Sequence, residues 1–184
     1  DLAMRAMLDP GDEVLIPQPS YVSYVPCAQL IHAVPVIIEL KEENEFRLTK
    51  QELLDAITDK TKMLVMPFPN NPTGAIMEKE DLEEIAKVCV EKDIFVLSDE
   101  IYSELTYKDK HVSIASMPGM KERTVVINGF SKSYAMTGWR IGYCAASEKI
   151  AKLMISIQSH VTSNVCSITQ YAALEALNGP QDEI

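Results

Sequence analysis

The chain has 184 residues, of which 47% are hydrophobic and 24% are charged, a balance typical of globular domains and not of disordered or membrane-spanning chains. Its 17 basic and 27 acidic side chains give a formal net charge of −10 at pH 7. This is the wrong sign for a surface that binds nucleic acid or an anionic membrane, so both are excluded as expected partners. An anionic ligand would have to be held by a local pocket.

Cysteine and histidine usage argues against a metal site and against a disulfide framework. The 4 cysteines and 3 histidines are dispersed, with no Cys-x-x-Cys pair. Cys27, Cys89, Cys144 and Cys166 stand in apolar stretches, so we expect small buried side chains in a reducing, cytoplasmic compartment. No apolar run approaches the ~20 residues that a membrane span needs. Because the chain opens at Asp1 inside an expected helix, we expect its natural N-terminus to lie further upstream.

Short apolar strands alternate with amphipathic helices along the chain. The expected strands cover 13–17, 34–39, 63–66, 94–97, 124–127 and 141–145. The expected helices cover 2–7, 22–31, a segment opened by the capping box Thr49 to Glu52, a segment with apolar positions from Leu82 to Cys89, and 148–177 as one helix or two. Apolar strands that alternate with helices predict one α/β domain, a three-layer α/β/α fold with a mostly parallel sheet.

Polar clusters follow three of these strands, at the edge where ligands gather in such sheets. They are Asn-Asn-Pro-Thr-Gly at 70–74, Ser-Asp-Glu-Ile-Tyr at 98–102 and Gly-Phe-Ser-Lys-Ser-Tyr at 129–134. A fourth cluster, Gly-Trp-Arg-Ile-Gly at 138–142, places a cation between glycines that allow backbone to approach a ligand closely. These groups fit pyridoxal 5′-phosphate (PLP): a lysine for the Schiff base, an acid for the pyridine nitrogen, and arginine with serine for the phosphate.

The clusters resemble those of fold-type-I, PLP-dependent aminotransferases over essentially the whole chain, and Ala-Met-Thr-Gly-Trp-Arg at 135–140 resembles bacterial aspartate aminotransferases. The resemblance implies that Lys132 forms the Schiff base and moves the proton at the substrate α-carbon. It implies that Asp99 pairs with the pyridinium nitrogen and keeps the ring protonated. Tyr102 and Asn71 would donate hydrogen bonds to the phenolic oxygen of the ring. On this basis Lys132, Asp99 and Tyr102 are the expected catalytic residues.

The same resemblance assigns the remaining cofactor contacts. Ser131 and Arg140 would bind the phosphate, Arg140 through a two-pronged contact that lysine could not reproduce. Tyr21 resembles the aromatic residue that stacks on the cofactor ring. Glu100 would alternate to the side of the strand opposite Asp99, so we expect a structural or salt-bridged role for it.

The resemblance also implies parts that this chain does not contain. Complete members of the family have a second, smaller domain built from both chain ends, so we expect 1–184 to be the PLP-binding large domain, incomplete at both ends. A glycine-containing phosphate loop would precede Asp1, and an arginine for the substrate carboxylate would follow Ile184. The parent enzyme would be a homodimer that transfers an amino group between an amino acid, with aspartate favoured, and a 2-oxo acid. We expect this chain alone to be inactive.

Several alternatives remain open from the sequence. The same core serves PLP-dependent carbon–sulfur lyases and aminocyclopropane-carboxylate-type synthases, which differ in their substrate contacts. A nucleotide-binding Rossmann dehydrogenase shares the alternation of strands and helices, but it needs a glycine fingerprint that is not visible here. An inert fragment that keeps only the fold is the last alternative.

Overall fold

A computed structural model describes residues 1–107, 110–182 and 184. The strands are β1 (Glu13–Gln18), β2 (Val34–Glu39), β3 (Thr61–Met66), β4 (Phe95–Asp99), β5 (Thr124–Gly129) and β6 (Gly142–Ala145). The α-helices are α1 (Leu2–Met7), α2 (Tyr24–Leu30), α3 (Lys50–Ala56), α4 (Lys79–Glu91), α5 (Glu148–Val161) and α6 (Ser167–Asn178). Three short 3-10 helices are η1 (Glu42–Asn44), η2 (Ile114–Ser116) and η3 (Thr137–Trp139).

The strands form one sheet in the order β2-β1-β3-β4-β5-β6. All neighbouring strands are parallel except β5 and β6, which are antiparallel. Leu15 in β1 lies opposite Val36 on one side and Leu64 on the other, so this strand is paired along both edges. The expected mostly parallel sheet is confirmed, and the antiparallel β6 closes it at one end.

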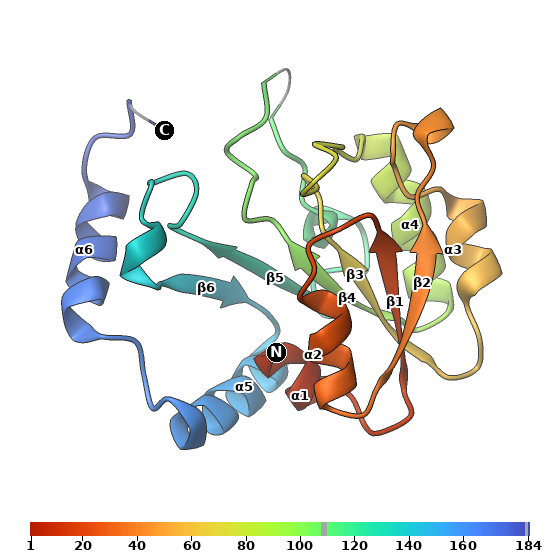
Figure 1. The fold of residues 1–184 in the computed structure, drawn as a ribbon, viewed down its shortest axis with the longest axis horizontal. Coiled ribbons are helices and arrows are strands. Elements are labelled where there is room, and N and C mark those ends of the chain that lie inside the picture. Colours follow the sequence, from red (N-terminus) through yellow and green to blue (C-terminus); the bar gives the residue numbers. More distant parts are fainter. Residues whose placement is uncertain (108–109, 183) are drawn as a thin grey trace.

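Helices cover both faces of the sheet and complete the three expected layers (Figure 1). On one face, α3 and α4 pack through Leu53, Ile85 and Cys89 against alternate residues of the strands. On the other face, α1, α2 and α5 pack on the remaining strand residues through Met4, Ala28 and other apolar side chains. Because both faces are covered, the strand residues have to be apolar in succession, which explains the continuous runs in the sequence.

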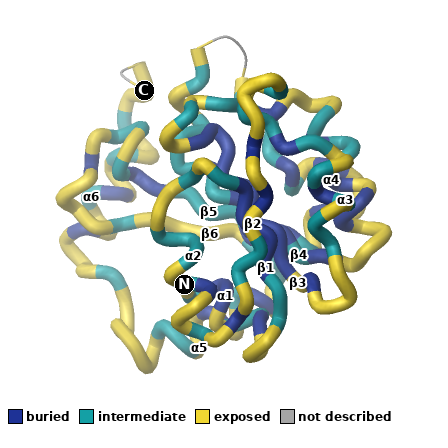
Figure 2. The backbone as a smooth tube through the Cα atoms, turned by 45° about the vertical axis from the view of Figure 1, so that its right-hand side comes forward, coloured by how far each residue is buried: buried dark blue, intermediate teal, exposed yellow. Residues whose placement is uncertain are grey.

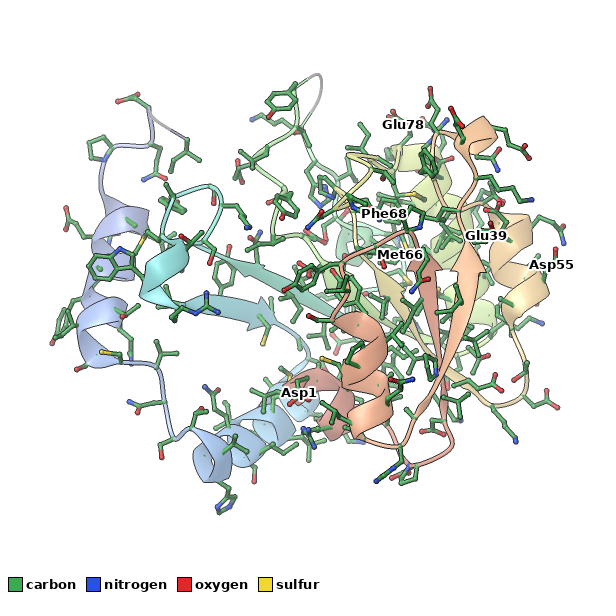
Figure 3. All side chains as sticks on the ribbon, in the orientation of Figure 1. Asp1, Glu39, Asp55, Met66, Phe68 and Glu78 are labelled. Carbon is green, nitrogen blue, oxygen red and sulfur yellow. The ribbon has the colours of Figure 1, made fainter. Side chains whose placement is uncertain are left out.

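The burial pattern separates this interior from the helix surfaces (Figure 2). Met66 and Phe68 lie inside the fold, whereas Asp55 and Glu78 project from its periphery (Figure 3). Among the residues that the structure describes, no helix combines the length and apolar character that crossing a bilayer requires.

Two local predictions were specific enough to compare residue by residue. The capping box is confirmed: the Glu52 N–H donates to Thr49 Oγ1 at 3.3 Å, and the Thr49 N–H donates to Glu52 Oε2 at 3.0 Å. The segment 148–177 consists of two helices, α5 and α6. In Figure 1, α6 stands beside β6 and away from the helices that cover the sheet.

The prediction of buried cysteines is correct for Cys89 and wrong for two others. Cys144 and Cys166 are exposed, and Cys27 is only partly buried. Cys144 belongs to β6, the edge strand beside β5, whose four residues are all exposed. Cys166 is the N-cap residue of α6, which packs on only a small apolar cluster. An apolar neighbourhood in sequence therefore did not translate into burial at this end of the sheet.

Candidate active site

A cavity of about 320 Å³ opens at the carboxyl ends of β1, β3, β4 and β5. Every site residue that the sequence predicted lines it: Tyr21, Asn71, Asp99, Tyr102, Ser131, Lys132 and Arg140. Parallel strands end at the same edge of a sheet, so segments far apart in sequence meet there. Arg140 reaches the same edge because β6 runs antiparallel and its first residue follows shortly after.

Asp99 is the last residue of β4 and carries its carboxylate to the wall of the cavity. The Tyr24 hydroxyl donates a hydrogen bond to Asp99 Oδ2 at 2.8 Å, and the Ile101 N–H donates to Oδ1 at 3.2 Å. Burial raises the pKa of Asp99, and these two hydrogen bonds offset part of the rise. Burial and the adjacent carboxylate also raise the pKa of Tyr24, so its hydroxyl remains a donor.

Lys132 and Tyr102 face each other across the cavity. The ammonium nitrogen of Lys132 lies 5.6 Å from the centroid of the Tyr102 ring. Ser131, the residue before the lysine, is half-buried, whereas Lys132 itself is exposed. The amine is thus within the cavity and accessible to a small molecule.

Arg140 has a left-handed backbone, with φ of 53°, directly after η3. Its Nη1 donates to the Thr137 carbonyl at 3.0 Å, which fixes the guanidinium on its own turn. The rest of the guanidinium is exposed at the cavity and free of side-chain ion pairs among the residues described. An oxyanion such as a phosphate group suits such a fork of N–H donors.

Gly129 and Gly142 allow two strands to pack closely, a role that the sequence did not suggest. A Cβ on Gly129 would lie 3.0 Å from the Gly142 Cα, and one on Gly142 would lie 3.0 Å from the Asn128 carbonyl oxygen. These two glycines therefore allow β5 and β6 to approach closely at the base of the segment that carries Lys132 and Arg140. The space beside the Gly142 Cα is occupied by the backbone of β5, whereas a Cβ on Gly138 would meet nothing within 4 Å.

Tyr24 is a site residue that the sequence analysis missed, since it was counted only as part of a helix. It lines the cavity together with Pro67, Pro69, Ile101, Ile127 and Thr137. Tyr24 follows Tyr21 by three positions, a spacing that places two side chains on one side of a helical turn. The rings lie in an edge-to-face arrangement with centroids 6.0 Å apart. This three-residue spacing was the feature of the sequence that could have identified Tyr24 as a site residue.

The residues of this cavity fit PLP on one physical ground above all. Among the residues that the structure describes, Asp99 makes no ion pair, although its carboxylate is partly buried. A buried carboxylate needs a positive partner, and a protonated pyridine nitrogen would supply one. Ser131 and Arg140, which could bind a phosphate, line the same cavity, as does the half-exposed ring of Tyr21.

The chain has an α/β fold and a cavity lined by an accessible lysine, Lys132, and comparison with known proteins identifies its family. The family model "Aminotransferase class I and II" matches residues 1–184. The chain therefore belongs to the class I and II aminotransferase family. This membership removes the nucleotide-binding dehydrogenase that shares the alternation of strands and helices.

Individual relatives agree with that assignment. An aspartate aminotransferase of Bacillus subtilis (strain 168) is 50% identical over 182 residues, which cover 98% of this chain and 46% of that protein. The crystal structure of an aromatic aminotransferase from Pyrococcus horikoshii OT3 superposes with a TM-score of 0.95 at 46% identity, covering 98% of this chain and 48% of that one. An aspartate aminotransferase from Rhizobium meliloti gives a TM-score of 0.96 at 41% identity, covering 98% and 46%. The chain spans about half the length of the relatives it matches.

Proposed function

We propose that the enzyme to which this chain belongs transfers an amino group between an amino acid and a 2-oxo acid, with PLP held in the cavity described above. The observation that carries the proposal is a partly buried carboxylate, Asp99, which makes no ion pair among the described residues and lies in the same cavity as an accessible amine, Lys132. When bound, PLP supplies an aldehyde that bonds to amines and a ring that accepts electron density from the substrate.

Lys132 would form the covalent bond to the cofactor and, once displaced by the substrate amine, move the proton at the α-carbon. Its position beside the Tyr102 ring keeps the amine inside the cavity. Asp99 would hold the proton on the pyridine nitrogen. Tyr24 supports that role by holding the carboxylate in place and favouring its charged form.

The other side chains would orient the ring. Tyr102 and Asn71 would donate hydrogen bonds to the phenolic oxygen, which favours its anionic form. Ser131 and Arg140 would bind the phosphate, and Tyr21 would cover one face of the ring. All of these residues line the one cavity, which supports the division of roles.

Aspartate, with 2-oxoglutarate as acceptor, is our proposed substrate pair, supported by relatives named aspartate aminotransferase at 48% to 50% identity. Residues 1–184 would be the PLP-binding large domain of a cytoplasmic, homodimeric enzyme. Comparing kcat/KM for aspartate with that for an aromatic amino acid tests the substrate class. Release of ammonia with a 2-oxo acid, in place of amino transfer, would identify a lyase.

The cofactor site is tested by borohydride reduction of the full-length enzyme with PLP bound, followed by peptide mapping. We expect the reduced cofactor on the peptide that contains Lys132 and no incorporation in a Lys132→Ala variant. Lys152, a surface lysine paired with Glu148, offers a control: Lys152→Ala should retain the label. A label on any other lysine would overturn the assignment of the site.

A further inference from the structure

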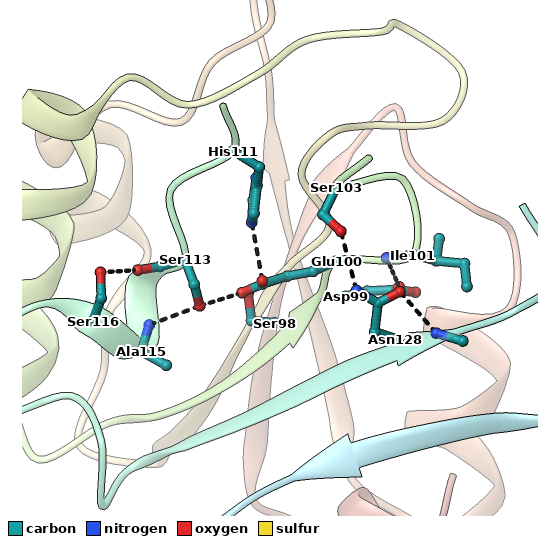
Figure 4. Close-up of polar contacts among 11 residues, drawn as sticks. Ser98, Asp99, Glu100, Ile101, Ser103, His111, Ser113, Ala115, Ser116 and Asn128 are labelled. Carbon is teal, nitrogen blue, oxygen red and sulfur yellow. Dashed lines mark hydrogen bonds and ion pairs between the residues drawn. The ribbon is translucent and has the colours of Figure 1, made fainter. Parts of the chain in front are cut away.

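Glu100 is a buried carboxylate next to Asp99 in sequence; its side chain points toward Ser113 and His111 (Figure 4), and it does not line the cavity. It is 5% exposed. Its Oε1 accepts hydrogen bonds from the hydroxyls of Ser98 at 2.9 Å and Ser113 at 2.5 Å. Its Oε2 lies 3.0 Å from the Nε2 of His111. The ion-pair contact expected for Glu100 is present. What needs explanation is why a carboxylate is buried at this position.

The charge on Glu100 is maintained by its partners. Burial alone would raise the pKa of this carboxyl, yet His111, Ser113 and Ser98 together outweigh burial and lower it. Buried ion pairs are often no more stabilising than well-packed apolar side chains of the same volume. Net stability therefore does not account for a charged group here. Two hydroxyl hydrogen bonds and the close His111 nitrogen do fix the position of the carboxylate, because each partner restricts the others.

The backbone of Glu100 begins the turn that carries Tyr102. Its N–H donates to the Ile127 carbonyl at 2.8 Å, which extends the contact between β4 and β5 by one residue. Its carbonyl accepts from the Ser103 N–H at 2.9 Å, so the turn closes around Tyr102. A rotation at Glu100 would displace Tyr102 on one side and Asp99 on the other.

A second hydrogen bond braces the far end of the same turn. Asn128 Nδ2 donates to the Ser103 hydroxyl at 3.1 Å, and Asn128 lies in β5, just ahead of Ser131 and Lys132. The turn is thus attached to the strand that leads to the lysine. Its other attachment is the side chain of Glu100, which is anchored to His111 and to Ser113 at the start of η2.

We propose that Glu100 is a positioning residue for the reaction: anchored by His111 and Ser113, it sets the turn from Asp99 to Leu105 so that Asp99 and Tyr102 both face the cofactor. This inference rests on the proposed function, because it concerns the same cavity. The two neighbouring carboxylates would have different roles. Asp99 would contact the cofactor, and Glu100 would hold the segment that supports Asp99.

The first test uses the full-length protein without cofactor, in which hydrogen–deuterium exchange reports the turn directly. We expect the amides of Ser103 and Leu105, which close the turn, to exchange about 10-fold faster or more in Glu100→Ala than in the wild type. Glu100→Gln keeps an acceptor for the two serines, so its exchange rates should lie between those of the wild type and those of Glu100→Ala. Glu52→Ala is the matched control, because it removes a capping carboxylate that does not line the cavity. It should leave exchange at Ser103 unchanged.

The second test uses the same proteins loaded with PLP. Displacement of Asp99 and Tyr102 should shift the pH titration of the cofactor absorbance band in Glu100→Ala and lower kcat by about 10-fold to 100-fold, as is typical for residues that orient a primary contact. Ser113→Ala removes the hydrogen bond to Glu100 and the cap on Ala115 but keeps the Glu100 carboxylate and His111, so it should shift the titration in the same direction by less. If Glu100→Ala does not fold, Ser113→Ala still tests the proposal.

Distinct results separate this proposal from the proposed function. If the variants lose thermal stability but keep the wild-type exchange rates, absorbance titration and kcat, Glu100 has a purely structural role and the positioning proposal is wrong. If the wild-type enzyme itself takes up no PLP at Lys132, the proposed function fails independently of Glu100. Altered exchange together with an altered titration supports the positioning role.

Discussion

The Tyr24 hydroxyl donates a 2.8 Å hydrogen bond to Asp99 Oδ2 and so joins the first turn of α2 to the end of β4, across 75 residues of sequence. The bond has two effects on the carboxylate. It fixes the direction in which Asp99 faces the cavity, and it favours the charged form against the effect of burial.

Replacing this tyrosine should therefore change the pH dependence of the reaction. In Tyr24→Phe the Asp99 carboxylate loses a donor, so its pKa rises further and the ionised form is reached only at higher pH. A hydrogen bond to a charged group contributes roughly 1.5–3 kcal/mol, so we expect kcat near neutral pH to fall by about 10-fold to 100-fold. The acid limb of the pH–kcat profile should move to higher pH. An unchanged acid limb would show that Asp99 does not set it.

Substitutions of Asp99 and Arg140 should affect turnover and cofactor binding to different extents. Asp99→Asn removes the group that keeps the ring protonated, so we expect kcat of the full-length enzyme to fall by roughly 100-fold or more, with a smaller effect on PLP affinity. Arg140→Ala removes an anchoring contact, so the Kd for PLP should rise by about 10-fold to 100-fold with a smaller loss of kcat at saturating cofactor. Equal losses of both quantities in both variants would contradict this division.

Asp99→Asn, which should reduce turnover, should stabilise the cofactor-free protein. Burial raises the pKa of Asp99 above its ordinary value of 3.8, so the folded protein holds this proton more tightly than the unfolded chain. The stability that Asp99 contributes is therefore complete below pH 3.8 and is lost as pH rises through the raised pKa. We expect Asp99→Asn to raise the Tm of the cofactor-free protein at pH 7, and the gap to narrow as pH falls. Addition of PLP should reverse the order.

The capping box of α3 offers a prediction about stability alone. Thr49→Ala removes an acceptor for the Glu52 N–H and should lower the free energy of unfolding by about 1 kcal/mol. Ser147 is the matched control, because it is the N-cap residue of α5 but makes no side-chain cap hydrogen bond. Ser147→Ala should change stability by no more than about 0.5 kcal/mol in chemical denaturation. Equal effects of the two substitutions would show that the hydrogen bond at Thr49 contributes nothing.

Local chemistry explains what could be predicted from the sequence. Thr49 and Glu52 interact within one turn, so their pattern needed no knowledge of the fold. The convergence of Asp99 and Lys132 followed from a single rule, that parallel strands end at one edge. The roles of the cavity residues came from a resemblance and remain predictions for the experiments above.

Contacts between distant segments explain what could not be predicted. No periodicity connects Tyr24 to Asp99 or His111 to Glu100, since each pair depends on how two elements pack in three dimensions. The exposure of Cys144 depends on the number of strands beside β6, which hydrophobic patterning does not reveal. Similarly, the close approach of Gly129 and Gly142 appears only once β5 and β6 are paired.

The last prediction concerns the 184-residue chain by itself, which should fold and bind PLP weakly but not catalyse transamination. Folding is expected because both faces of the sheet close over apolar clusters made by this chain alone. Among the residues described, the cations that line the cavity are Lys132 and Arg140, and both have proposed roles toward the cofactor. The substrate carboxylate is then left without a clamp, and orientation of reactants can contribute ~7–11 kcal/mol to lowering a barrier. The assay uses the purified chain with aspartate, 2-oxoglutarate and PLP, measured above the background rate of free PLP. Turnover comparable to that of the full-length enzyme would mean that a residue within this chain binds the substrate carboxylate, and that Arg140 is the first candidate to reassign.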